Sequence, residues 1–190
     1  MKNSKSNKNN QGFTIIEILI VLFFAGILLV VLFNIYDWHG KVYSYQQAFI
    51  RVSSANRTAI SNIQSYVSQS YRVYSSASVN GITYNTGADT LVLQMPALDT
   101  NNSIIFGKWD KVAFYPDGSN FYMQLEPDPS SRRTKINKIL SDTLLSVVFI
   151  YNDTDMDNVN NVRVTFKSSK QVKDQIITQG MDQSMYLLNY

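Results

Sequence analysis

The sequence predicts an α+β protein in which one long N-terminal helix packs against antiparallel β-strands. Two features carry this prediction. Residues 13–33 are apolar with a single charged side chain, and no proline interrupts the chain from Phe13 to Pro96. After Tyr74, short β-rich runs alternate with turn residues. A long helical part followed by a strand-rich part is typical of the α+β architecture.

The apolar segment is predicted to span a membrane. Residues 13–36 form a helix long enough to cross a hydrocarbon core about 30 Å thick. Three lysines lie within the first eight residues, which favours a cytoplasmic N-terminus. Tyr36 and Trp38 are typical of the aromatic belt at the opposite membrane surface. We therefore expect a single-pass membrane protein with a cytoplasmic N-terminus, and the family resemblance described below implies the inner, cytoplasmic membrane.

The helix is predicted to continue beyond the membrane to about Tyr74, which makes residues 37–75 its soluble half. Apolar residues recur there at three- and four-residue steps and mark one buried stripe. The stripe comprises Phe49, Val52, Ala55, Ala59, Ile60, Ile63, Tyr66 and Val67. The opposite, polar face carries Arg51, Asn56, Arg57, Asn62 and Gln64. This pattern is ordinary core packing.

Residues 76–190 are predicted to form a β-rich globular domain. The clearest signal is a hairpin that turns through Pro116-Asp117-Gly118, where proline fixes φ and glycine tolerates a positive φ. The sequences around Gly81, Gly87 and Pro96 are read as strand boundaries. The predicted strands cover residues 82–84, 90–95, 111–115, 120–126, 143–151, 161–167 and 185–189.

The composition argues against an enzyme. The chain has no cysteine, which excludes disulfides, thiolate metal sites and a cysteine nucleophile. Its one histidine, His39, lies at the predicted membrane edge, so the globular domain has no Ser-His-Asp triad and no histidine zinc site. The only glutamates are Glu17 and Glu126. We therefore expect a non-enzymatic protein without a resident cofactor.

The charge balance gives no bulk attraction to nucleic acid. The formal net charge is +3, from 17 basic and 14 acidic residues. Without the three lysines of the first twelve residues, 14 basic side chains stand against 14 acidic ones. Nucleic-acid binding would need a local basic patch. The one cluster of this kind, Arg132-Arg133 with Lys135 and Lys138, is interpreted as a solvated loop.

The start of the apolar segment carries a specific motif. Gly12 is followed at once by Phe13, Glu17 comes four residues later, and Gly26 lies further along the same segment. This pattern resembles the class III signal of type IV pilin-like proteins, which include type IV pilins and the pseudopilins of secretion and competence systems. The chain departs from many of these pilins at Asn34, where they have a helix-kinking proline.

The resemblance implies a processing pathway. A prepilin peptidase would cut after Gly12, which makes residues 1–12 a leader peptide, and Phe13 would be N-methylated. The fold would be pilin-like, with the helix serving as both membrane anchor and spine. The partners implied are the prepilin peptidase, other pilins or pseudopilins, and an inner-membrane assembly platform. The mature chain would then enter a filament at the cell surface or in the periplasm.

Glu17 is predicted to act in assembly. A carboxylate inside a spanning segment costs about 2.5–3.5 kcal/mol on insertion scales unless it finds a partner. Cleavage after Gly12 would create an α-amino group on Phe13, and the amine of one subunit could then pair with Glu17 of its neighbour. The alternative is an acidic residue at the end of an ordinary anchor. The protein would then be a non-assembling, membrane-anchored binding domain, such as a sensor or adhesin.

The last third of the chain resembles the larger minor pilins and minor pseudopilins more specifically. In these proteins, a strand that ends in Tyr-x-Asp precedes an acidic turn and a strand of the Val-x-Val type. Tyr151-Asn152-Asp153 and Val162-Arg163-Val164 follow that layout. The resemblance favours a minor subunit, which would prime or cap a filament. The sequence does not distinguish motility, adhesion, DNA uptake and secretion.

Two further patterns suggest binding sites. Asp153, Asp155 and Asp157 alternate in a connection and could hold Ca²⁺, although the loop lacks the glycine and the bidentate glutamate of an EF-hand. Ordinary turn chemistry explains the same residues. Numerous aromatic residues could form an adhesive or glycan-binding face, but core packing is the preferred interpretation. They are Tyr71, Tyr74, Tyr84, Phe114, Tyr115, Phe121 and Tyr122.

Overall fold

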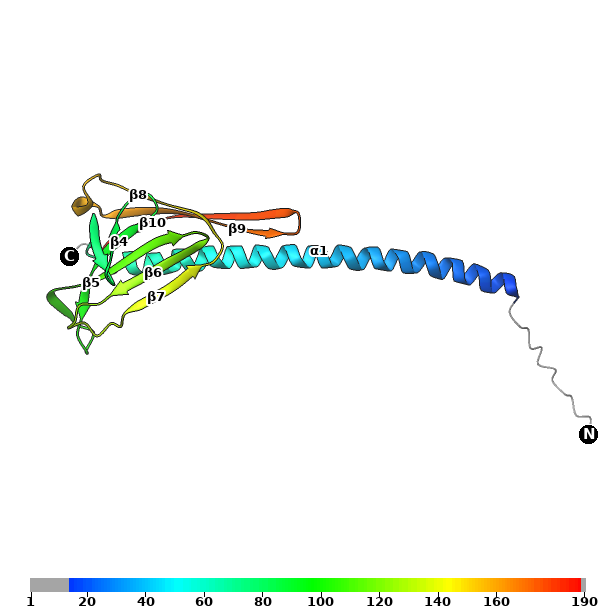
Figure 1. Cartoon of the computed structure of the whole chain (residues 1–190), viewed down its shortest axis with the longest axis horizontal. Helices are drawn as coiled ribbons and strands as arrows, with labels where there is room; N and C mark the ends of the chain where they lie inside the picture. Colours follow the sequence, from blue (N-terminus) through cyan, green and yellow to red (C-terminus); the bar gives the residue numbers. More distant parts are fainter. Residues whose placement is uncertain (1–13, 189–190) are drawn as a thin grey trace, which may run out of the picture. The chain divides into compact units, whose positions relative to one another are not determined.

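The computed structural model describes residues 14–188. It contains one long helix, α1 (Ile15–Val67), followed by antiparallel β-sheets, which confirms the predicted α+β class (Figure 1). The chain divides into two compact units, one that ends at Ser44 and one that begins at Tyr45. The first unit holds the apolar part of α1, and the second holds the rest of α1 and all of the strands.

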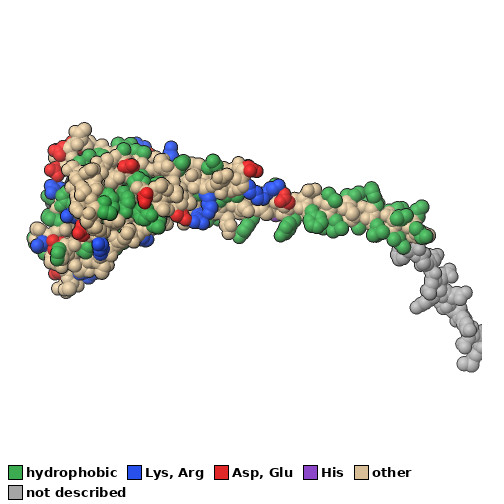
Figure 2. Space-filling view, viewed as in Figure 1, with side chains coloured by type: hydrophobic (Ala, Val, Ile, Leu, Met, Phe, Trp, Pro, Cys, Tyr) green, Lys and Arg blue, Asp and Glu red, His purple; other side chains and the backbone are tan. Residues whose placement is uncertain are grey.

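Nearly all described side chains of the first unit are exposed. Its large apolar side chains from Ile15 to Ile35 are each at least 47% exposed. Hydrophobic atoms accordingly cover this part of α1 in the space-filling view (Figure 2). This helix is long and apolar enough to cross a membrane, as the sequence predicted.

Helix α1 ends at Val67, earlier than the predicted Tyr74. Polar side chains directly after the helix satisfy the carbonyl groups of its last turn. Ser70 Oγ donates to the Tyr66 carbonyl at 2.7 Å, and Gln69 Nε2 donates to the Ser65 carbonyl at 2.7 Å. Such side-chain bonds compete with continued helix. The chain then turns into β1 (Arg72–Val73), so the soluble half of the helix is shorter than the predicted 37–75.

The buried face of α1 in the second unit follows the predicted stripe with two corrections. Its buried residues are Ala48, Val52, Asn56, Ala59, Ile60, Ile63 and Val67. Asn56, which was assigned to the polar face, lies four residues after Val52 and is therefore buried, with Nδ2 donating to the Gln179 carbonyl at 2.9 Å. Phe49 was assigned to the stripe, but it is 41% exposed.

A five-stranded antiparallel sheet has the order β1-β4-β5-β6-β7. Its other strands are β4 (Leu91–Leu98), β5 (Ile104–Asp117), β6 (Asn120–Glu126) and β7 (Ile136–Ser141). Strand β4 continues through Pro96, which was predicted to end it. The register shifts directly after Pro96, and β1 pairs with β4 only at Leu93 and Gln94, so the proline replaces no ladder hydrogen bond to β1. Strand β7 was not predicted.

The predicted hairpin between β5 and β6 is confirmed, but its turn is shifted. Pro116 pairs with Phe121 inside the ladder, and Asp117 pairs with Asn120. The two-residue loop is therefore Gly118-Ser119, and Gly118 has a φ of +58°. A short hairpin favours glycine at its first loop position because the backbone there needs a positive φ.

A separate two-stranded hairpin joins β2 (Ser76–Val79) to β3 (Ile82–Asn85). Its loop is Asn80-Gly81, with φ values of +56° and +84°. Two positive values are the mark of a type I′ turn, for which Asn-Gly is the strongest short signal.

A three-stranded antiparallel sheet has the order β10-β9-β8. Its strands are β8 (Leu144–Tyr151), β9 (Asn161–Val172) and β10 (Gln175–Tyr186), with the short helix η1 (Met156–Asn158) before β9. The last strand therefore begins ten residues before the predicted 185–189. Lys173, with a φ of +51°, occupies the turn between β9 and β10. Because β10 is mostly polar, with Ile177 and Met185 as its buried residues, hydrophobic alternation does not reveal it.

One hydrophobic core joins α1 to both large sheets. Ile60 and Ile63 of α1 face Phe114 and Phe121 of the five-stranded sheet, and Phe166 represents β9 in the same cluster. The rings of Phe114 and Phe121 lie 6.3 Å apart, and those of Phe121 and Phe166 lie 5.1 Å apart. Phe114 and Phe121 are thus core residues, as predicted.

Candidate functional site at the start of the apolar helix

Glu17 lies in the first turn of α1 and forms a capping box with Thr14. The Thr14 backbone N–H donates to Glu17 Oε2 at 2.8 Å, and the Thr14 hydroxyl donates to the same oxygen at 2.9 Å. In return, the Glu17 N–H lies 3.3 Å from Thr14 Oγ1. The sequence Thr-Ile-Ile-Glu is the Ser/Thr-x-x-Glu pattern of this motif, which satisfies N–H groups that have no partner inside the helix.

The capping box corrects one part of the sequence interpretation. Glu17 does have a polar partner within its own helix, and the capping pattern in the sequence could have revealed it. The cap stabilises the helix end by about 0.5–2 kcal/mol, and the N-terminal end of the helix dipole also favours a carboxylate. Both bonds from Thr14 fall on one oxygen, so capping by itself uses only Oε2. Both cap partners are neutral groups, so the cap supplies no counter-charge to Glu17.

The two residues of the predicted cleavage site, Gly12 and Phe13, lie outside the described residues. The fourth motif position, Gly26, lies within α1, and a Cβ at that position would meet nothing within 4 Å. Asn34 also lies within the helix, which continues through it.

Charged residues flank the apolar segment of α1, with Glu17 before it and Asp37 after it. After Glu17, residues 18–36 contain none. Nineteen helical residues span about 28 Å at ~1.5 Å each, close to the ~30 Å thickness of a hydrocarbon core. The Asp37–Lys41 ion pair, with an N–O distance of 2.5 Å, and the contacting rings of Trp38 and His39 follow. A membrane span between two polar boundaries accounts for this order.

The aspartates of the predicted calcium site organise a turn. Asp153 accepts a hydrogen bond from the Asp155 N–H at 2.9 Å, and Asp155 accepts one from the Asp157 N–H at 3.1 Å. Asp157 forms an ion pair with Arg72 at 3.1 Å. Within residues 14–188, no group of three metal-ligating side chains is gathered at one point. The arrangement matches the turn chemistry given as the alternative.

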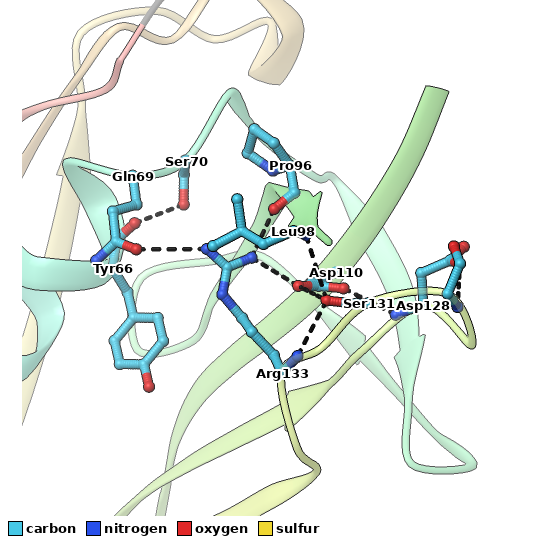
Figure 3. A network of polar contacts seen from close by, with 10 residues as sticks. Tyr66, Gln69, Ser70, Pro96, Leu98, Asp110, Asp128, Ser131 and Arg133 are labelled. Atoms are coloured by element: carbon cyan, nitrogen blue, oxygen red, sulfur yellow. Dashed lines mark hydrogen bonds and ion pairs between the residues drawn. The ribbon is translucent and has the colours of Figure 1, made fainter. Parts of the chain in front are cut away.

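Arg133 lies in the predicted loop, between β6 and β7, but its side chain is not solvated as the sequence suggested. Its side chain is only 17% exposed, and its Nη1 lies 2.6 Å from Oδ2 of Asp110, whose side chain is fully buried (Figure 3). The same nitrogen donates to the Pro96 carbonyl at 2.5 Å. No local pattern predicts this pairing, because Asp110 and Arg133 are separated by a strand and a loop.

The buried ion pair fastens the segment between β6 and β7. Asp110 also accepts hydrogen bonds from the Asp128 N–H at 2.8 Å and the Ser131 hydroxyl at 2.9 Å. Arg133 Nη2 reaches Gln69 Oε1, just after α1, at 3.5 Å. The network thus connects a loop, two strands and the end of the helix (Figure 3). Arg133 therefore has a structural role, which removes it from the basic cluster.

The tyrosines of the aromatic set lie outside the core. Tyr115 stacks on Tyr122 with ring centroids 5.4 Å apart and contacts Tyr84 at 4.6 Å. All three are half-buried. Tyr71 contacts Trp109 at 5.2 Å, and the Arg72 guanidinium lies 5.2 Å from the centre of the Tyr74 ring. Core packing thus accounts for the phenylalanines, whereas the tyrosines stabilise each other across strands at the surface.

We find no match for the chain among protein-family models, curated proteins or solved structures. Its fold class is established by its own helix and sheets, and a function has to be inferred from its own residues.

Proposed function

We propose that the chain is a structural, non-enzymatic subunit of a type IV pilus or a type II secretion-like filament. It is made as a prepilin, cut after Gly12 by a prepilin peptidase and methylated on Phe13. Helix α1 holds it in the inner membrane until the assembly platform transfers it into the filament. Its role there is that of a minor subunit that primes or caps the filament, as the resemblance of its last third favours.

The observation that carries the proposal is a charged residue at one place on an otherwise apolar helix. Glu17 lies in the first turn of α1, four residues after the predicted new N-terminus, and uncharged residues follow for about one membrane thickness. An unpaired carboxylate at this depth is costly. A subunit whose free amine approaches Glu17 of its neighbour turns two costly charges into one pair, which favours a single register of assembly.

The second unit supports the proposal because its side-chain contacts have structural roles. One face of its half of α1 is buried in a core shared with two sheets, so the helix and the strands form one folded domain. Its aspartates form turns, and the half-buried Arg133 fastens a loop through its ion pair with the buried Asp110. These features suit a building block whose surface contacts other subunits.

The capping box favours a second candidate function. Because Thr14 satisfies Glu17 within one chain, the motif can be explained without a neighbouring subunit. The protein would then be a monomeric, membrane-anchored extracytoplasmic domain that acts as a sensor or adhesin. The two functions differ in whether Glu17 must be charged.

Two substitutions of Glu17 separate these functions. Glu17→Gln keeps a side chain that can close the capping box but removes the charge, whereas Glu17→Ala removes both. For a filament subunit, both variants insert into the membrane and both are lost from the sheared filament fraction. For an anchored domain, Gln replaces Glu without consequence.

Mass spectrometry of the membrane-extracted wild-type protein provides the independent readout. We expect a chain that begins at methylated Phe13. An intact Met1 start, together with normal behaviour of Glu17→Gln, would refute the filament proposal.

A further inference from the structure

The second unit carries two apolar patches at opposite ends. The first, the bulge patch, consists of Ile104, Phe106 and Trp109 of β5. The second, the helix patch, consists of Tyr45, Phe49 and Ile50 of α1. Phe106 is 95% exposed, and the three residues of the helix patch are 41–65% exposed. Aromatic side chains displayed this openly mark interaction sites more often than ordinary surface.

The bulge patch projects because β5 contains extra residues. Pro96 of β4 pairs with Trp109, but the next residue, Ala97, pairs with Ile105. Residues 106–108 are therefore left outside the ladder, and Gly107 takes a φ of +71°. Bulges of this sort re-aim a side chain. Here the bulge turns Phe106 into solvent.

The position of the bulge patch follows from ring contacts along α1. Tyr66 contacts Phe114 at 5.9 Å, and Tyr71 contacts Trp109 at 5.2 Å. The first residues of β5 therefore lie beyond the C-terminal end of α1. Arg72, next to Tyr71, pairs with Asp157, so the acidic turn lies at this same end. We call it the acidic end after this turn, although Arg72, Lys108 and Arg132 also lie there.

The helix patch lies at the other end, beside a basic hairpin. Asn56 contacts Gln179 and Gln64 contacts Gln183, so β10 runs in the same direction as α1. The turn that precedes β10 therefore lies toward Tyr45. Lys167 and Lys170 lie on β9 as it approaches this turn, and Lys173 lies in the turn itself. The acidic residues nearby are Asp174 and Asp142, and Asp142 forms an ion pair with Arg51, next to Ile50. This is the basic end.

We propose that the acidic end of one copy of the chain docks against the basic end of another copy. Phe106 of the first copy packs against Phe49 and Tyr45 of the second. The acidic turn of Asp153, Asp155 and Asp157 faces Lys170 and Lys173. One contact then covers both apolar patches and joins opposite charges, which gives specificity and steering. Because the two surfaces differ, the contact is head-to-tail, and such contacts propagate into open helical arrays.

This inference rests on the proposed function and adds a partner, a second copy, and the surfaces that meet. For a minor subunit that primes or caps a filament, it means that the primed or capped end holds a short run of at least two successive copies of the chain.

Cysteine cross-linking of the full-length chain tests the contact. The natural chain has no cysteine, so every disulfide comes from the introduced pair. Phe49 lies 18 residues before the end of α1, about 27 Å along the helix axis. Cysteines at 49 and 106 of the same chain are therefore beyond the ~7 Å Cα separation that a disulfide can bridge. Both positions are exposed, so the substitutions leave the core intact.

We expect Phe49→Cys/Phe106→Cys to form a ladder of disulfide-linked multimers in membranes and sheared filaments on oxidation. The matched control is Phe49→Cys/Ile82→Cys, because Ile82 is also exposed, at 53%, but lies on β3. The control should give no ladder. Adding Lys170→Glu and Lys173→Glu to the first pair should weaken its ladder several-fold.

The N-terminal mass of the same samples keeps this test separate from that of the filament. Protein that is cut at Phe13 and recovered in filaments but gives no ladder would overturn the head-to-tail contact and leave the filament proposal in place. A ladder of equal strength in the control would also overturn it. A ladder formed by uncut protein would support the contact while the filament proposal fails.

Discussion

The two halves of α1 have the same secondary structure in different surroundings. Up to Ile35, the large apolar side chains are at least 47% exposed. From Ala48 to Val67, one face is buried by β-strands of the same chain. Backbone hydrogen bonds are equivalent in both halves, so they do not explain the difference. The second half finishes its core with its own sheets, whereas the first half needs apolar surroundings that the chain itself does not supply.

This comparison predicts the largest effect for phenylalanines that differ in burial. Phe121→Ala removes a fully buried ring at the centre of the core and should destabilise the second unit by about 3–5 kcal/mol. Phe23→Ala removes a ring that is 66% exposed and should leave the unfolding of that unit unchanged. Thermal melts of the detergent-solubilised protein, followed by near-UV circular dichroism, measure both. Equal shifts for the two variants would show that the halves do not differ as described.

A smaller effect is expected for polar groups that the second unit buries. Asp110→Ala leaves Arg133 without its carboxylate in a largely buried site and should cost about 3 kcal/mol. Replacing both residues, as Asp110→Leu/Arg133→Met, should recover part of this loss, because the penalty comes from the unpaired charge. Denaturant titration measures the three free energies of unfolding. A double variant that is no more stable than Asp110→Ala would mean that the hydrogen bonds to the loop matter more than the pairing.

The sequence predicted the helix and most of the strands because their signals are local. Uninterrupted apolar residues define the first half of α1, and three- and four-residue spacing defines its second half. Val147, Phe149, Val162 and Val164 alternate with outward residues along β8 and β9, which marks these strands. The hairpin at Gly118 likewise rests on its turn residues.

Three of the failures, at Asn56, Arg133 and β10, have a common physical cause, which is that distant partners decided the outcome. Asn56 is buried because β10 lies beside this part of α1. Arg133 is half-buried because its guanidinium pairs with Asp110 of β5. Strand β10 pairs with β9 over its whole length although its own residues are mostly polar. In each case the deciding contact joins residues that are far apart in sequence, where spacing carries no information.

The candidate site was predicted in part. The motif predicted a role for the charge of Glu17, but the prediction did not include the local cap that Glu17 forms with Thr14. Glu17 belongs both to the Thr-x-x-Glu capping pattern and to the motif at the start of the apolar segment. The sequence alone does not favour one of these two roles for it. Only the hydrogen bonds of the helix end distinguish which groups the carboxylate already holds.

The smallest effect is expected at an exposed ion pair of the second unit. Arg163 donates to Asp182 through Nε at 2.9 Å and through Nη2 at 2.5 Å. This hydrogen-bonded guanidinium lowers the pKa of the Asp182 carboxyl from its ordinary value. A lowered folded-state pKa means that the pair stabilises the fold above the unfolded-state pKa of about 3.9 and stops doing so as the pH falls through the folded-state pKa.

Asp182→Asn tests this small contribution. The variant should be slightly less stable than the wild type at neutral pH, and the difference should shrink as the pH falls below about 4, because both proteins then lack the charged pair. Arg163→Gln is the matched control and should show the same convergence, since it removes the other partner. Melting temperatures measured from pH 7 to pH 2 suffice. A difference that is constant across this range would show that Asp182 acts through packing between β9 and β10, and that its charge does not contribute to stability.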